Sequence, residues 1–156
     1  MKLQFKQQQF QLDAVASVVD IFAGQGKHSG FDYHMDKGLG MDAELDMNFI
    51  GFRNAPIQLS QDTVSQQVRT QQLRYGLKPS ETLSVQDVNG RSSYNLTIEM
   101  ETGTGKTYTY IRTLMELNKQ YGWLKFIIVV PSIAIREGVL KSFQIMADHF
   151  QMEYGK

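Results

Sequence analysis

The stretch IEMETGTGKTYTY, residues 98–110, decides how the fold of this chain is interpreted. It contains Gly105-Lys106-Thr107, the tail of the phosphate-binding pattern G-x-x-x-x-G-K-[ST], with Gly103 as a second flexible position. Glycines at positive φ allow successive backbone amides to converge on a phosphate, and the following lysine and hydroxyl suit phosphate oxygens and Mg²⁺. We predict a nucleotide and Mg²⁺ site in which Lys106 and Thr107 are catalytic and Thr107 is the Mg²⁺ ligand. The nucleotide-binding residues of this loop would be Thr102, Gly103, Thr104, Gly105, Lys106, Thr107 and Tyr108.

The sequence on either side of this loop predicts an α/β fold with parallel strands. Residues 94–100 alternate apolar and polar side chains, as strands do, and residues 126–130 form a continuous apolar run typical of a buried parallel strand. A helix is expected from about Lys106 to Gly122, and another after Ser132, which can cap it. The order strand, loop, helix, strand, helix predicts a P-loop βαβ portion over residues 93–156.

Two further regions precede this one. Residues 1–23 have apolar side chains at helical spacing, and Gly24 and Gly26 are expected to end the helix. Residues 24–92 are interpreted as an inserted loop and helical segment, with a short hairpin near residues 49–52. Ser60 is a candidate N-cap for a helix that ends before Gly76, and residues 77–92 suggest a linker with turns at Pro79-Ser80 and Asn89-Gly90.

Composition narrows the class of protein. The 156 residues contain no cysteine, which excludes disulfides and cysteine-based zinc sites. No apolar run approaches the roughly 20 residues of a membrane helix, and the first residues lack the apolar block of a signal peptide. We therefore expect a cytoplasmic protein without membrane contact. The group Asp32, His34 and Asp36 could face a metal if extended, but a solvated loop is favoured.

The loop lacks the usual leading glycine, since Met100 stands in its place. This form resembles motif I of superfamily-2 helicases and translocases. FQLDA, residues 10–14, looks like their aromatic-Gln-x-x-Ala element, which implies that Gln11 reads adenine and Phe10 stacks on it. VVPSIAIREGV, residues 129–139, resembles motif Ia, which implies that Ser132 and Arg136 contact DNA phosphates. The alternatives are a solvated glutamine in a glutamine-rich helix and a plain helix cap.

Residues 98–143 as a whole look like the N-terminal motor region of the Res subunit of type III restriction enzymes, and NAPIQLS and GLKPSE resemble the same family. The resemblance implies a RecA-like P-loop NTPase that translocates on double-stranded DNA with ATP and Mg²⁺. It also implies a partner methyltransferase (Mod) subunit and DNA cleavage by a distant nuclease domain.

No Asp-Glu pair follows Val130, although such motors use one to order Mg²⁺ and water. We therefore expect an N-terminal fragment, a partial RecA-like domain truncated after the second motif-bearing strand and helix. It would hydrolyse ATP poorly alone, leave residues 126–130 uncovered, and be marginally stable or associate. A truncated, non-catalytic remnant that binds nucleotide or a partner is the alternative. A small P-loop kinase is disfavoured because no arginine lid or acidic acceptor box follows.

Overall fold

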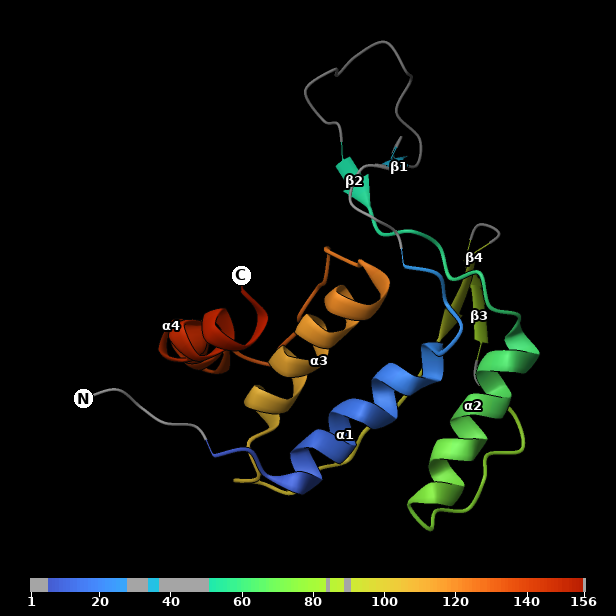
Figure 1. Ribbon diagram of the computed structural model, residues 1–156, viewed down its shortest axis with the longest axis horizontal. Coiled ribbons are helices and arrows are strands. Elements are labelled where there is room, and N and C mark those ends of the chain that lie inside the picture. The colour runs from blue at the N-terminus through green and yellow to red at the C-terminus, as the bar shows by residue number, and fades with distance from the viewer. Residues whose placement is uncertain (1–5, 28–33, 37–50, 84, 89–90, 156) are drawn as a thin grey trace.

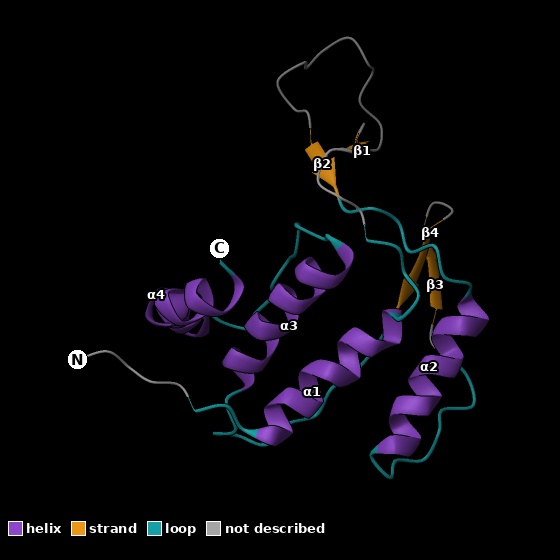
Figure 2. Cartoon of the chain, viewed as in Figure 1, coloured by secondary structure: helices purple, strands orange, loops and turns teal. Residues whose placement is uncertain are grey.

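A computed structural model describes residues 6–27, 34–36, 51–83, 85–88 and 91–155 of the chain. Its helices are α1 (Gln9–Val19), which continues into a 3₁₀ turn, η1 (Asp20–Phe22), then α2 (Gln61–Arg74), α3 (Lys106–Tyr121) and α4 (Ile133–Tyr154). Its strands are β1 (His34–Asp36), β2 (Gly51–Arg53), β3 (Val85–Val88) and β4 (Arg91–Tyr94). Figure 2 shows that helices dominate the described part of the chain.

The predicted helices are confirmed, and local chemistry sets their ends. The Ser60 hydroxyl accepts a hydrogen bond from the Thr63 amide (3.1 Å) at the start of α2. Gly76, with φ +69°, follows the last residues of that helix. Ser132 caps α4 in the same way, accepting from the Ile135 amide at 3.3 Å. Each cap satisfies an amide that the first turn of a helix leaves without a helical partner.

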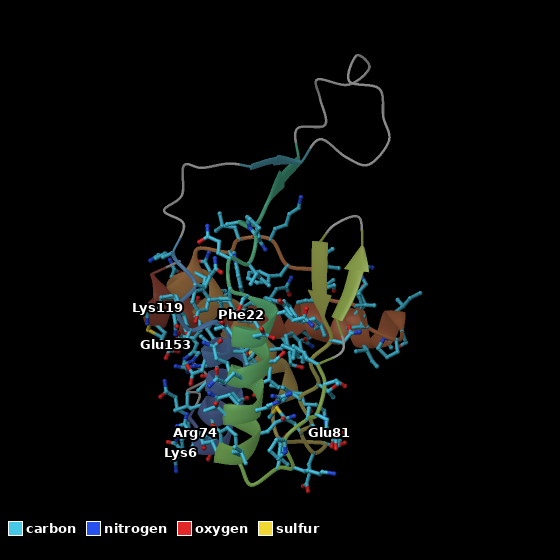
Figure 3. The ribbon with its side chains drawn as sticks, turned by 90° about the vertical axis from the view of Figure 1, so that its right-hand side faces the viewer. Lys6, Phe22, Arg74, Glu81, Lys119 and Glu153 are labelled. Carbon is cyan, nitrogen blue, oxygen red and sulfur yellow. The ribbon has the colours of Figure 1, made fainter. Side chains whose placement is uncertain are left out.

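Helix α3 lies between α1 and α4 (Figure 1). The end of α1, η1, α2 and the end of α3 enclose the larger core, in which the Phe22 and Trp123 rings meet edge to face at 5.0 Å. The Tyr121 hydroxyl donates to the Val19 carbonyl (2.9 Å), which ties α3 to α1. Figure 3 views the molecule with α2 in front of α1 and Phe22 beside the upper end of α2. This core consists of Val15, Val19, Ile21, Phe22, Val64, Val68, Leu117, Tyr121 and Trp123.

A second, smaller core joins α3 to α4. It contains Tyr108, Ile111, Met146 and Phe150, and the Tyr108 and Phe150 rings stack at 5.6 Å. The two cores together bury opposite faces of α3, which makes this helix the centre of the described fold. The phosphate-loop candidate lies at the N-terminal end of α3, where α1 also begins (Figure 1).

The parallel strands predicted for residues 94–100 and 126–130 are not formed. Residues 95–100 and 122–130 contain no strand, and Tyr94 instead ends an antiparallel hairpin strand. A strand is completed by hydrogen bonds from a neighbour, and no neighbouring strand lies beside either segment within the described ranges. Ile127 and Val129 are 89% and 87% exposed, so the expected buried strand is uncovered here.

One asparagine holds the start of this apolar segment in place of a strand ladder. The Asn54 side-chain carbonyl accepts from the amides of Leu124 (2.9 Å) and Lys125 (2.8 Å). Its amide donates to the Lys125 carbonyl at 2.6 Å. These bonds fix the residues after α3 against the segment that leads into α2.

Two antiparallel hairpins replace the predicted loop and linker. Strand β1 pairs with β2, and β3 pairs with β4 from Val85 opposite Tyr94 to Val88 opposite Arg91. The linker with turns predicted over residues 77–92 is therefore wrong from Val85 onward, where β3 begins, whereas residues 77–83 contain no helix or strand. The hairpin predicted near residues 49–52 falls partly outside the described residues, and so does the Asn89-Gly90 turn.

A buried glutamine joins the end of η1 to the segment before α2. The Gln25 side-chain carbonyl accepts from the Gln58 amide (2.8 Å), and its own amide donates to the Pro56 carbonyl (3.3 Å). Gln67 of α2 adds a donation to the Ala23 carbonyl at 2.8 Å. We call the paired bonds of Gln25 the Gln25 clamp.

Candidate nucleotide-binding site

The glycine-rich loop adopts the backbone that its sequence predicts. Gly103 has φ +83° and Gly105 has φ +85°, a left-handed conformation that side chains with a Cβ rarely adopt. Gly105 is also the residue from which α3 begins. The loop therefore turns sharply into the helix, as a phosphate-binding backbone requires.

The start of α3 supplies amide donors at this turn. The Gly105 carbonyl accepts the first helical bond, from the Thr109 amide at 3.0 Å, so the amides of Lys106 and Thr107 precede the helical ladder. Amides in this position, together with the positive end of the helix dipole, favour an anion. Thr107 is half-buried beside them.

Lys106 folds back over the loop. Its ammonium donates to the carbonyl oxygens of Met100 (2.7 Å) and Glu101 (2.9 Å). The Thr104 hydroxyl donates to the same Glu101 carbonyl at 2.6 Å. The side chain is exposed, so its charge is held at the loop by these contacts and remains accessible to solvent. The role of the Met100 and Glu101 carbonyls could not be found from residue types, because the backbone provides both acceptors.

The aromatic-glutamine element lies against the loop although it is far away in the sequence. The Gln11 side-chain amide donates to the Thr104 carbonyl at 2.8 Å, across 93 residues of sequence. Gly105 lies next to the same amide group. Phe10 precedes Gln11 on the first turn of α1 and is 49% exposed, so its ring is open to a stacking partner. The structure thus brings the two predicted motifs together.

Tyr108 occupies a different position from the rest of the predicted set. Its side chain is buried in the core between α3 and α4, and its hydroxyl accepts from Arg112 at 2.7 Å. The ring therefore faces α4, and the backbone of Tyr108 lies in the first turn of α3, directly after the loop. Sequence reasoning missed Arg112, for which the spacing of four residues after Tyr108 on one helix was the available signal.

The residues predicted to contact DNA lie at the start of α4. The Ser132 hydroxyl is engaged as the helix cap described above. Arg136 is exposed one turn later, and its guanidinium is 3.6 Å from the Glu137 carboxylate. Neither residue contacts the loop through a hydrogen bond or ion pair found in the described part of the chain.

A metal site other than the proposed Mg²⁺ position can be sought only among the described residues. In the described ranges, no group of three or more histidines and acidic residues could hold a metal ion. The group predicted as a weak alternative includes Asp32, which lies outside the described residues, as do the side chains of His34 and Asp36.

No helix in the described part of the chain is long and apolar enough to cross a membrane.

Comparison with known proteins identifies the family. Residues 56–155, more than half of the chain, match the family described as "Type III restriction enzyme, res subunit". The EcoP15I Res subunit of Escherichia coli is 35% identical over 103 residues, which is 65% of this chain and 10% of that protein. The EcoPI Res subunit of Escherichia phage P1 is 40% identical over 81 residues, covering 45% of this chain and 8% of that protein.

A third relative, the StyLTI Res subunit of Salmonella typhimurium, is 57% identical over 44 residues, which is 28% of this chain and 4% of that protein. The chain therefore spans a tenth or less of the length of these curated relatives. The family match implies a RecA-like helicase fold, with which the order of the phosphate loop and α3 agrees. This chain belongs to the family of type III restriction enzyme Res subunits.

Proposed function

We propose that this chain is the ATP-binding N-terminal part of an ATP-dependent DNA-translocating Res subunit. The main support is that two elements distant in the sequence lie in contact. Lys106 folds over the loop around Gly103 and Gly105, and Gln11 is hydrogen-bonded to that loop. A turn that only joined a segment to a helix would need neither the lysine nor the distant glutamine.

The residues present fit an adenine nucleotide with Mg²⁺. Phosphate oxygens would accept hydrogen bonds from the backbone amides of Lys106 and Thr107. The Lys106 ammonium would then donate to a phosphate instead of to the two carbonyl oxygens. The Thr107 hydroxyl is suited to complete the Mg²⁺ ligand set, and the bound ion would offset the charge of the phosphates. Gln11 offers one donor and one acceptor to the adenine edge, and Phe10 offers a stacking face.

The wider assignment rests on the family. The relatives are named as Res subunits of type III restriction-modification enzymes. By that likeness we assign to the parent protein a site-specific, ATP-dependent deoxyribonuclease activity on double-stranded DNA, with a Mod methyltransferase subunit as partner and a cytoplasmic location. Ser132 and Arg136, exposed at the start of α4, would contact DNA phosphates.

The 156-residue chain by itself is expected to bind the nucleotide and to hydrolyse it poorly. Lys106 and Thr107 supply phosphate and Mg²⁺ contacts, but the sequence has no Asp-Glu pair after Val130 to position an attacking water. A nucleotide-binding role without turnover is therefore the function assigned to the 156 residues, and hydrolysis is assigned to the parent protein.

Titration of the chain with ATP in the presence of Mg²⁺ tests the assignment. Lys106→Ala should weaken binding about tenfold or more, because a charge-assisted hydrogen bond contributes about 1.5–3 kcal/mol. Lys141→Ala removes an exposed positive charge from α4 and is the matched control, with unchanged affinity expected. Equal affinity of the wild type and Lys106→Ala would overturn the site. ATP turnover by the wild-type chain at the rate of a working motor would overturn the division between binding and hydrolysis.

A further inference from the structure

One carboxylate on α4 gathers donors from two other parts of the chain. Glu153 receives two hydrogen bonds from the Arg112 guanidinium of α3, one of them at 3.2 Å. It also accepts from the Gln7 side-chain amide (2.9 Å), which precedes α1. His149, one turn earlier on α4, lies 3.4 Å from the same carboxylate. Neither the nucleotide contacts nor the DNA contacts proposed above use this group of residues.

The Arg112 contact fixes Glu153 firmly. The Arg112 side chain is only 9% exposed and that of Glu153 is 24% exposed. The guanidinium also donates to the Tyr108 hydroxyl, so the carboxylate is tied to the first turn of α3, just after Thr107. A two-pronged arginine–carboxylate pair that is partly buried has a defined geometry. Glu153 therefore has a set position relative to the phosphate loop.

The Gln7 contact extends this fixed position to α1. Gln8 is the N-cap of α1. The Gln8 carbonyl accepts a hydrogen bond from the backbone amide of Gln11 (3.1 Å), but the Gln8 side chain makes no capping bond. The first turn of α1, which carries Phe10 and Gln11, thus begins two residues after Gln7, whose side chain is bonded to α4. On its other side the same turn is held by the bond from Gln11 to Thr104.

We infer that Glu153 is a positioning residue for adenine recognition, acting through Gln7 to set the first turn of α1 against the phosphate loop. This inference rests on the proposed nucleotide site. Arg112 holds the Glu153 carboxylate against α3, which begins at the phosphate loop. Gln7 links the same carboxylate to the start of α1, where the adenine-reading residues lie. Loss of the Gln7 contact should loosen the base-reading residues and leave the phosphate contacts intact, because Lys106 and Thr107 are held by the loop and α3.

The test compares ligands that share phosphates and differ in the base. The 156-residue chain is titrated with ATP, GTP and inorganic tripolyphosphate, each with Mg²⁺. Gln7→Ala removes an exposed amide and should leave the fold intact. We expect it to weaken ATP binding about threefold, the effect of one modest hydrogen bond, and to leave tripolyphosphate unchanged. Gln9→Ala is the matched control, because its amide bonds Asp13 on its own helix.

Glu153→Gln completes the experiment. If Gln7 acts through the carboxylate, the two substitutions should not add. The ratio of ATP to GTP affinity in the double variant Gln7→Ala/Glu153→Gln should then fall no further than in the more affected of the two single variants. An unchanged ratio of ATP to GTP affinity in Gln7→Ala would overturn the inference while the effect of Lys106→Ala still stood. A uniform loss for all three ligands would show a purely structural role and also overturn it. Equal binding by the wild type and Lys106→Ala would instead remove the nucleotide site itself.

Discussion

Replacing Gly105 by alanine tests how α1 meets the phosphate loop. Gly105 has φ +85°, and a Cβ added there would lie 2.4 Å from the side-chain amide nitrogen (Nε2) of Gln11. Gly103 has nearly the same φ, +83°, but nothing lies within 4 Å of a Cβ added at that position. Both substitutions therefore strain the backbone to a similar degree, and Gly105→Ala alone also displaces the Gln11 amide.

The expected difference follows from these contacts. A residue with a Cβ in the left-handed region costs about 1–2 kcal/mol, and this cost applies to both variants. Displacing Gln11 also breaks its 2.8 Å hydrogen bond to the Thr104 carbonyl, which contributes about 1 kcal/mol net. The free energy of unfolding should thus fall by about 1–2 kcal/mol in Gly103→Ala and by about 2–3 kcal/mol in Gly105→Ala.

Urea unfolding of the two variants measures this difference. With a slope of about 2 kcal/mol per molar urea, the extra loss in Gly105→Ala corresponds to a midpoint lower by about 0.5 M. Adding Gln11→Ala to each variant should bring the midpoints together, because the displaced side chain is then gone. Equal midpoints for the two single variants would refute the placement of Gln11 against Gly105.

Two further predictions concern the exposed apolar segment and the alkaline limit of stability. Ile127→Lys and Val129→Lys should reduce self-association in light scattering and change the free energy of unfolding by less than about 0.5 kcal/mol, because both side chains are largely exposed; a large destabilisation would show that they are buried. Burial and then a hydrogen bond to the Glu116 carboxylate raise the pKa of Tyr154 above its ordinary 10.0, so the stability it adds is complete below pH 10.0 and is lost as the pH rises further. In urea unfolding Tyr154→Phe should show a shallower loss above that pH, and identical pH profiles would contradict this.

The local features of the fold could be predicted from the sequence because neighbouring residues determine them. Ser60 and Ser132 cap their helices as expected, since a hydroxyl before a helix meets an amide three residues later. Gly103 and Gly105 adopt positive φ because the loop must turn into α3 over a few residues. Such features depend on residue types that lie within one or two turns of each other.

The strands could not be predicted in the same way. The apolar run at residues 126–130 indicates a buried strand, but a strand also needs neighbours that no local pattern identifies. The hairpin of β3 and β4 was missed for a different reason. Asn89-Gly90 between Val85 and Tyr94 is a two-residue hairpin signal, but the same pair also suits a turn within a linker.

The candidate site was predictable in its motifs and not in its long-range contacts. The loop and the aromatic-glutamine element were each recognisable, but their distance in space depends on how α1 packs along α3. Tyr108 shows the opposite case. Its place in the motif suggested nucleotide binding, whereas Phe150 of α4, distant along the chain, and Arg112, one turn later on α3, determine where its side chain lies.

The Gln25 clamp has a consequence for the engineering of this chain. The chain leaves the core at Gln25 and returns at Pro56 and Gln58, and the closure is made by one side-chain amide. The clamp itself sets the two ends of this segment side by side, so a longer connection between them would add little to the cost of closure, since doubling the length of a closed loop costs only about 0.6 kcal/mol. A peptide could therefore be inserted ahead of Asn54, which holds Leu124 and Lys125, while the packing of α1, α2 and α3 is kept.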